Sequence, residues 1–260
     1  ELAAYARRCD LALGDSEFNR RELEAMGFPR TDVLPVVPGF QHLDVAPDRR
    51  VLEAFDDAWT NVLFVGRVIP NKRVDDVIRF FHAYQQFFNP RSRLLLVGSS
   101  TGFDRYYALL QDLVARLGTR DVHFLGHVSN REVTACYDVA DVFLCASEHE
   151  GFCVPLVESF YKGVPVVAYA ATAVPATLDG AGVLYTGKDP WHVAALVDRV
   201  VSDGGVRERI LAGQDAALAR LLARDFRGTL LGFVERALAA EPLPPHLVTD
   251  DFWQQVESTE

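Results

Sequence analysis

The sequence predicts an α/β protein built on a doubly wound parallel sheet, and two observations carry this prediction. Short apolar runs recur along most of the chain, and segments with the apolar spacing of a helix separate them. Parallel strands need a covering connection between them, so this alternation favours one parallel sheet with helices on both faces. The expected strands are residues 61–66, 93–98, 122–126, 142–145, 164–168 and 181–185.

The helices expected between these strands follow from local patterns taken in chain order. Residues 74–88 and 103–117 are amphipathic, and a shorter helix is expected at 132–137. Pro155 can open the next helix, because the N–H that proline lacks is not needed there, and Gly163 can end it. Residues 190–240 are expected to be mostly helical.

The two ends of the chain have a different organisation. Near the start we expect a strand at 11–13, a helix opened by Asp15 or Ser16, and a strand at 33–37. Prolines at 35, 38 and 47 are typical of a connection between domains. Near the end, prolines follow residue 240, and residues 251–255 are expected to form a last helix. The predicted domains are therefore 1–45, 46–240 and 241–260.

Composition narrows the classes of function. The chain has 260 residues and a formal charge of −10, which argues against a nucleic-acid partner because phosphate backbones select basic surfaces. No apolar run approaches the ~20 residues that span a bilayer, and no signal-peptide pattern is present, so we expect a soluble, cytoplasmic protein. Because the sequence starts at Glu1 without Met, we expect it to be a piece of a longer protein.

Neither the cysteines nor the acidic pairs predict a metal. Cys9, Cys136, Cys145 and Cys153 lack C-x-x-C spacing, so reduced, mostly buried thiols are expected. The acidic pairs at 56–57, 75–76 and 250–251 fall on expected helices or at a helix start, where they are interpreted as solvated faces.

The loop after the strand at 61–66 carries Gly66, Arg67 and Lys72. The chain has only three lysines, and one of them follows a buried strand closely. An Arg fork and a Lys point charge can both make charge-assisted hydrogen bonds to a diphosphate. The alternative is a solvated loop in which Arg67 forms a structural salt bridge.

The loop after the strand at 142–145 carries Glu150 and leads into a helix with Glu158. The free backbone N–H groups of residues 151–156 would form a phosphate-binding site at the helix N-terminus. A carboxylate one turn further can accept hydrogen bonds from sugar hydroxyls. The alternatives are an exposed helix residue for Glu158, a helix-capping role for Glu150, and a pair of glycoside-hydrolase carboxylates, which would need a separation of ~5 Å in a retaining enzyme.

These motifs carry a family resemblance. The segment EGFCVPLVE, from Glu150 to Glu158, resembles the E-x7-E signature of the family 4 retaining glycosyltransferases of the GT-B fold. The segment GRVIPNK resembles the G-R-x4-K element of that family, and SEFNRRELEAMG with VLPVVPGF resembles the end of the N-terminal lobe and the linker. The resemblance implies the Rossmann-like, donor-binding C-terminal lobe with a short remnant of the N-terminal lobe.

The resemblance also implies a role for each matching residue. Arg67 and Lys72 would hold the diphosphate, Glu150 would face the donor sugar, and Glu158 would bind the ribose hydroxyls. The backbone at Val128 would meet the nucleobase, although loop packing is an equal alternative there. The remaining donor-contacting positions would be Gly66, Gly151, Phe152, Cys153 and Val154. Two departures stand out: the family usually has Gly at Cys153 and often Glu at Ala176.

The implied reaction is transfer of a hexosyl group from a UDP- or GDP-sugar to an acceptor hydroxyl, with retention of configuration and without a metal or other cofactor. The acceptor stays open among glycans, lipid-linked glycans and small molecules, and membrane association of the parent enzyme has no support in this sequence. A sugar-nucleotide epimerase and a non-catalytic nucleotide-sugar-binding module are the alternative functions.

Overall fold

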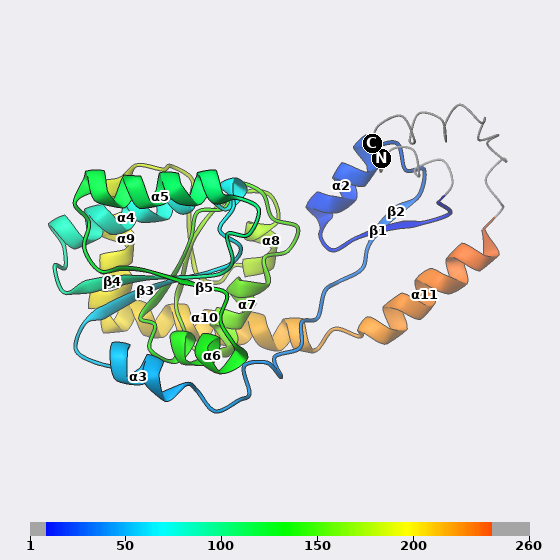
Figure 1. Cartoon of the computed structure of the whole chain (residues 1–260). Helices are drawn as coiled ribbons and strands as arrows, with labels where there is room; N and C mark the ends of the chain where they lie inside the picture. Colours follow the sequence, from blue (N-terminus) through cyan, green and yellow to red (C-terminus); the bar gives the residue numbers. More distant parts are fainter. Residues whose placement is uncertain (1–8, 241–260) are drawn as a thin grey trace. The chain divides into compact units, whose positions relative to one another are not determined.

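A computed structural model gives the structure of the chain and describes residues 9–240 (Figure 1). The chain divides into two compact units, of which one is Val37–Arg224 and the other joins the residues up to Val36 with those from Asp225 onward. The domain boundaries expected after residues 45 and 240 stay a prediction. The expected helix at 251–255 lies outside the described residues.

The centre of the larger unit is a six-stranded sheet in which every neighbouring pair of strands is parallel. Its strands are β3 (Thr60–Val65), β4 (Ser92–Val97), β5 (Val122–Gly126), β6 (Val142–Cys145), β7 (Val166–Tyr169) and β8 (Val183–Tyr185). The predicted fold class and all six strands are confirmed, although β7 and β8 each begin two residues later than predicted.

The order of the strands defines where a ligand would bind. Across the sheet the order is β5-β4-β3-β6-β7-β8, so the chain winds outward in one direction from β3 and in the other direction from β6. Ligands of doubly wound sheets bind beyond the carboxyl ends of the strands at this switch point. The two loops singled out in the sequence are the ones that follow β3 and β6.

Helices cover both faces of the sheet. In Figure 1, α4, α5 and α9 lie on one face, and α3, α6, α7 and α10 lie toward the other. Helix α4 packs against α5 and α9, and α7 packs against α8 and α10. The bounds are α3 (Arg49–Phe55), α4 (Val74–Phe87), α5 (Asp104–Leu117), α6 (Asn130–Asp138), α7 (Val154–Tyr161), α8 (Val174–Leu178), α9 (Pro190–Ser202) and α10 (Gly204–Leu222), with a 3₁₀ turn at Pro70–Lys72.

The inner strands β3, β4, β6 and β7 are buried on both faces, which explains their apolar runs, whereas the edge strands β5 and β8 are partly exposed. Alternate residues such as Val62, Phe64 and Leu96 belong to the core cluster that includes side chains of α4 and α9. Their neighbours Leu63 and Leu95, which point to the opposite face, are also fully buried. This sheet therefore gives the two loops at its switch point a rigid support.

The smaller unit contains β1 (Ala12–Gly14), α2 (Glu17–Ala25), β2 (Thr31–Val33) and α11 (Phe226–Ala239). Ser16 caps α2 by accepting a hydrogen bond from the Asn19 amide, as the sequence suggested. The strand predicted at 33–37 is wrong in its bounds. Its last ladder bond runs from the Leu34 amide to the Gly14 carbonyl at 2.9 Å, and the next residue is Pro35, which has no N–H to continue the ladder.

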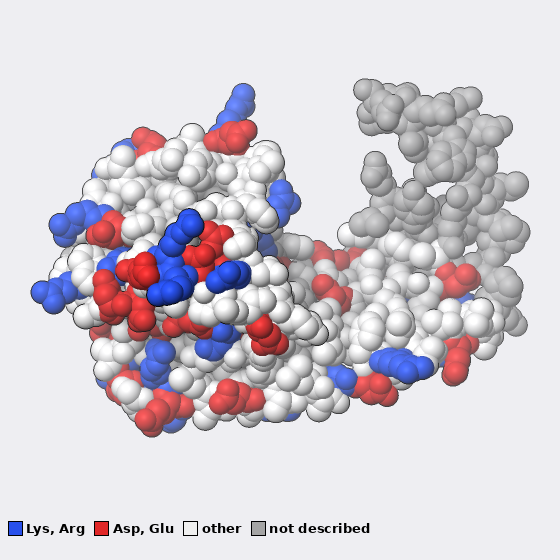
Figure 2. Space-filling model, turned by 60° about the horizontal axis from the view of Figure 1, so that its bottom comes forward, with Lys and Arg blue, Asp and Glu red and all other residues white. Residues whose placement is uncertain are grey.

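Surface charge is mixed on the face that Figure 2 presents. Lys and Arg side chains are interspersed there with Asp and Glu side chains. Within residues 9–240, no helix combines the length and the apolar character needed to cross a bilayer. The expectation that the chain does not bind nucleic acid stays a prediction.

His123 on β5 gives a first testable prediction, because its Nε2 is buried without a hydrogen-bond partner in the described structure. Burial lowers its pKa, with Arg93 acting in the same direction and Asp121 against it. A pKa below the unfolded value of ~6.5 means that the unfolded chain takes up the proton first, so stability falls as the pH falls below about 6.5. We expect His123→Phe to lose part of this dependence when urea unfolding is measured at about pH 5.5 and 7.5.

The control for this experiment is the exposed His192, whose side chain is 75% accessible. His192→Gln should keep the pH dependence of the parent chain. An unchanged pH dependence in His123→Phe would contradict the assignment.

Candidate functional site

The loops after β3 and β6 are held directly against each other. The Glu148 amide donates a hydrogen bond to the Asn71 carbonyl at 2.9 Å. The Asn71 side-chain amide in turn donates to the His149 carbonyl at 3.3 Å. These bonds join two segments more than seventy residues apart in the sequence, so the residues that follow β3 and β6 share one site.

Lys72 and Glu150 form the ion pair at the centre of this site. The Lys72 Nζ lies 2.6 Å from each carboxylate oxygen of Glu150. Glu150 is only 6% exposed, so its charge has a partner where water is scarce. Its backbone is also fixed, because its amide donates to the Thr172 hydroxyl at 2.9 Å and that hydroxyl donates to its carbonyl at 3.0 Å. The sequence named both residues, and the structure brings them together.

Arg67 remains available for an anion. It is exposed directly after β3, and no acidic side chain of residues 9–240 pairs with it. Its guanidinium carbon lies 5.6 Å from the centre of the Phe103 ring, a cation–π distance. The alternative of a structural salt bridge at Arg67 is therefore not what the described structure contains.

Two glycines let the strand ends approach each other beside Arg67. Gly66 has φ +155°, and its amide donates to the Val97 carbonyl at 2.9 Å. A Cβ on Gly98 would lie 1.8 Å from the Gly66 carbonyl oxygen, so only glycine fits there. Gly98 is a residue that the sequence reasoning did not single out, and its position directly after a buried strand was the available signal.

Helix α7 begins at the switch point with an uncapped N-terminus. It starts at Val154, one residue before the predicted Pro155, and the N-cap residue Cys153 makes no side-chain hydrogen bond to the first turn. The first amides of a helix carry a partial positive charge, and most of them have no partner inside the helix. The expectation of free amides up to residue 156 is wrong for Leu156, whose amide donates to the Cys153 carbonyl at 3.1 Å. Gly151 is partly exposed, whereas Phe152 is buried and its carbonyl accepts a hydrogen bond from Thr177.

Glu158 lies on α7 with both carboxylate oxygens already engaged. The His42 Nε2 is 2.8 Å from Oε1, and the Tyr137 hydroxyl donates to Oε2 at 2.8 Å. Glu158 is 8% exposed, so the alternative of an exposed helix residue is wrong. Burial, with the nearby Glu158 charge, raises the pKa of Tyr137 well above its usual range and keeps the phenol a donor. A carboxylate oxygen has two lone pairs, so each Glu158 oxygen can still accept a second hydrogen bond from a hydroxyl group.

His42 and Tyr137 are site residues that the sequence reasoning missed. Neither belongs to a motif, and His42 is 116 residues away from Glu158 in the chain. The segment around His42 is fixed by packing, because the Phe40 ring stacks on Tyr161 of α7 with centres 4.5 Å apart.

Val128 follows β5 and is partly buried before the start of α6. Because the strands are parallel, it lies at the same edge of the sheet as the loops after β3 and β6. Its role toward a nucleobase stays a prediction. Ala176 lies exposed on α8, beyond the buried Val174.

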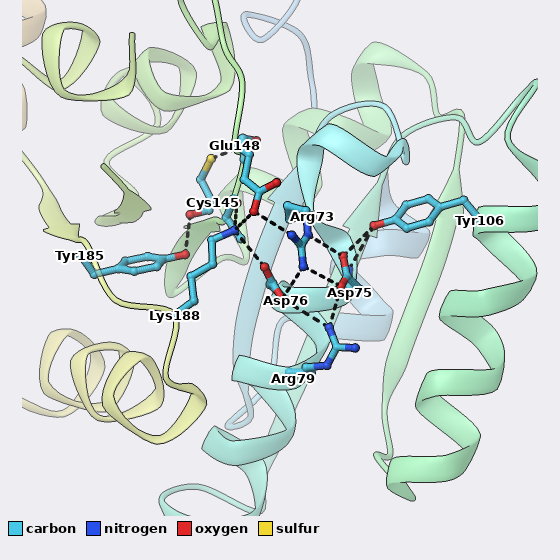
Figure 3. Close-up of polar contacts among 11 residues, drawn as sticks. Arg73, Asp75, Asp76, Arg79, Tyr106, Cys145, Glu148, Tyr185 and Lys188 are labelled. Atoms are coloured by element: carbon cyan, nitrogen blue, oxygen red, sulfur yellow. Dashed lines mark hydrogen bonds and ion pairs between the residues drawn. The ribbon is translucent and has the colours of Figure 1, made fainter. Parts of the chain in front are cut away.

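A cluster of charged side chains supports the two loops from α4 and from the segment after β8 (Figure 3). The Lys188 Nζ lies 2.9 Å from Asp76 and 2.8 Å from Glu148. The guanidinium of Arg73 also reaches Asp76 at 3.1 Å and Glu148 at 2.7 Å. The members of this charge cluster are Arg73, Asp75, Asp76, Arg79, Glu148 and Lys188, and the Tyr106 hydroxyl donates to Asp75 at 3.1 Å.

The charge cluster corrects the interpretation of residues 75–76 as a solvated face. Asp76 is 7% exposed and is partnered by Arg73, Arg79 and Lys188. The hydrogen bond from Lys188 lowers the pKa of Glu148, which keeps that carboxylate charged. Because Arg73 adjoins Lys72 and Glu148 is two residues from Glu150, the cluster sets the relative position of the central ion pair.

The cysteines agree with the sequence in burial. Cys136, Cys145 and Cys153 are buried, and all four cysteines are free. Cys145 and Cys153 interact: the hydrogen bond from Cys153 lowers the pKa of the Cys145 thiol, while the same bond and burial raise that of Cys153. The expectation of no metal site stays a prediction.

A doubly wound sheet with two cationic and acidic loops at its switch point defines a Rossmann-like lobe of the GT-B type, and the solved structures that resemble the chain are GT-B glycosyltransferases. The family described as glycosyl transferases group 1 matches residues 48–213. The chain belongs to this family.

Three relatives show the range of the similarity. The D-inositol 3-phosphate glycosyltransferase of Stackebrandtia nassauensis is 32% identical over 225 residues, 84% of this chain and 49% of that protein. The O-antigen chain mannosyltransferase B of Escherichia coli is 29% identical over 161 residues, 61% of this chain and 41% of that protein. The crystal structure of Anabaena HepE in complex with UDP-glucose has a TM-score of 0.75 at 18% identity, covering 90% of this chain and 66% of that chain. The chain thus spans about half the length of the two relatives found by sequence.

Proposed function

We propose that the chain is the donor-binding lobe of a retaining glycosyltransferase that transfers a hexosyl group from a UDP- or GDP-sugar to an acceptor hydroxyl. The observation that carries the proposal is the meeting of Lys72, Glu150 and the uncapped N-terminus of α7 at the switch point of the sheet. The HepE structure, which contains UDP-glucose, supports a nucleotide sugar as the donor.

In this proposal the positive groups stabilise the leaving diphosphate. The bond between the anomeric carbon and the phosphate oxygen breaks, so negative charge grows on that oxygen, and Arg67, Lys72 and the first amides of α7 are the groups to receive it. Glu150 faces the donor sugar and holds Lys72 in place. The acceptor oxygen attacks from the face that the phosphate leaves and gives its proton to the phosphate, which accounts for retention.

The remaining donor contacts follow the same arrangement. Glu158 accepts hydrogen bonds from the ribose hydroxyls, with Tyr137 and His42 fixing its carboxylate. Backbone groups at Gly66, Val128 and residues 151–154 line the rest of the donor. The proposal needs no metal for transfer and places the reaction in the cytoplasm. The acceptor, whether a glycan, a lipid-linked glycan or a small molecule, is left to the parts of the protein outside this lobe.

A thermal-shift panel of UDP, GDP, ADP and their sugars tests the donor assignment. A ligand at a hundred times its Kd stabilises the folded state by about 2.7 kcal/mol, and each kcal/mol raises the melting temperature of a domain of this size by about 2–4 °C. We therefore expect one diphosphate series to raise the melting temperature by roughly 5–10 °C. No shift with any nucleotide sugar at millimolar concentration would contradict the proposal.

A variant of Glu158 separates ribose recognition from general binding. Glu158→Gln keeps an acceptor for the Tyr137 hydroxyl but loses the negative charge. Because a hydrogen bond to a charged group contributes about 1.5–3 kcal/mol, the Kd for the nucleotide should rise about 10- to 100-fold. A nucleotide without ribose hydroxyls should bind the parent chain and this variant equally. Glu132→Gln, which changes the exposed capping box of α6, is the matched control with an unchanged Kd.

A further inference from the structure

Two thiols and a carboxylate meet beneath the loop that joins β6 to α7. Cys145 ends β6, Glu150 lies in the loop, and Cys153 is the N-cap residue of α7. Their sulfur and oxygen atoms all lie within 4.8 Å of one another. The three residues are 2%, 6% and 9% exposed, so the group is shielded from water.

Cys153 has a backbone conformation that is unfavourable for a cysteine. Cys153 has φ +70° and ψ +69°, in the left-handed region. A non-glycine residue there costs about 1–2 kcal/mol, and glycine would avoid this cost. Cys145 is held at the other side, because the Tyr185 hydroxyl donates to its carbonyl at 2.9 Å (Figure 3). A strained position therefore carries a thiol that faces a second, fixed thiol.

The spacing of the three donor atoms suits a small cation. Tetrahedral zinc has Zn–S bonds of ~2.3 Å and Zn–O bonds of ~2.0 Å, which place neighbouring ligand atoms roughly 3.3–3.8 Å apart. From at most 4.8 Å, side-chain movements of about 1 Å would close the site. The Lys72 ammonium lies 2.6 Å from both Glu150 oxygens, so a metal ion binds Glu150 by displacing this ammonium. Two thiolates, this carboxylate and the ammonium would be neutralised by one dication.

We propose that Cys145, Glu150 and Cys153 form a binding site for a borderline-soft dication of the zinc type, with a single water molecule as the fourth ligand. The Ser147 hydroxyl, 3.5 Å from the Cys145 sulfur, supplies a hydrogen-bond partner outside the ligand shell. The site differs from a catalytic cofactor site, because a metal here draws Glu150 away from Lys72. Glu150 and Cys153 also belong to the proposed donor site, but binding of the metal requires no nucleotide sugar.

Cd²⁺ is the direct probe, because its bonds to thiolates give a charge-transfer absorption that is absent for other ligands. The 260-residue chain, stripped with a chelator, should bind one equivalent of Cd²⁺ with this absorption, and Zn²⁺ should displace it. Cys145→Ala and Cys153→Gly should each weaken Cd²⁺ binding at least a hundredfold, and Glu150→Gln at least tenfold. Cys136→Ala, which removes a buried thiol of α6, is the matched control with unchanged binding.

Cys153→Gly keeps the experiment decisive, because glycine accepts the left-handed backbone and the variant should melt no lower than the parent chain. The proposal is overturned if one equivalent of Cd²⁺ gives no thiolate absorption. It is equally overturned if folded Cys153→Gly binds Cd²⁺ as tightly as the parent chain. Neither result touches the thermal-shift panel with nucleotides, so the two proposals fail separately.

Discussion

Lys72→Ala in the whole protein is expected to lower the turnover of glycosyl transfer at least a hundredfold. Lys72 is the half-buried cation that pairs with Glu150 between the two loops. Removal of one group that stabilises developing charge typically costs ~3 kcal/mol, or about two powers of ten in rate. Initial rates at saturating donor should be measured by separating the glycoside product from free nucleotide sugar. A free, epimerised nucleotide sugar as the product would favour an epimerase instead.

The same substitution leaves the Glu150 carboxylate buried without its partner, so stability and catalysis must be separated. The double variant Lys72→Ala with Glu150→Gln removes both charges, and we expect it to regain melting temperature but not turnover. Return of turnover in the double variant would contradict a role of Lys72 in the leaving-group site. Lys162→Ala is the control, because the Lys162 ammonium pairs with Asp138 at 2.5 Å and does not belong to the two loops. This variant should keep turnover within about threefold, as expected where no transition-state contact is lost.

The sheet was predictable because its strands carry a local signal. Residues 62–65 and 142–145 are apolar without interruption, as expected of strands buried on both faces. The order of the strands is a property of the folded chain, since β3 and β6 become neighbours although 76 residues separate Val65 from Val142 in the sequence. The two loops could be named from their residue types, whereas their contact required that order.

The contacts of the site were less predictable because their partners have no motif. Asp75 and Asp76 look like the acidic first turn of a solvated helix, and the folded chain adds Lys188 from a distant segment as a partner of Asp76. Glu158 was found through its motif, but His42 and Tyr137 reach it from other elements. The left-handed backbone of Cys153 is likewise a consequence of how the loop after β6 enters α7.

Asp76→Ala is expected to lower the free energy of unfolding by about 3 kcal/mol, which corresponds to a fall of roughly 6–12 °C in melting temperature. The carboxylate of Asp76 is buried and pairs with Arg73, Arg79 and Lys188. Loss of one partner of a buried ion pair costs about 3–5 kcal/mol. The lower end applies because Arg73 and Lys188 both keep Glu148. Urea or thermal unfolding of the 260-residue chain measures this effect.

Asp56→Ala is the matched control, because Asp56 belongs to an acidic pair that does remain exposed. An exposed aspartate of this kind should change stability by no more than ~0.5 kcal/mol. If Asp76→Ala costs as little as Asp56→Ala, the charge cluster is a surface feature and does not position the two loops. If the larger loss is found, the nucleotide Kd of Asp76→Ala should also rise, because Arg73 and Glu148 adjoin Lys72 and Glu150 and would no longer hold that ion pair in register.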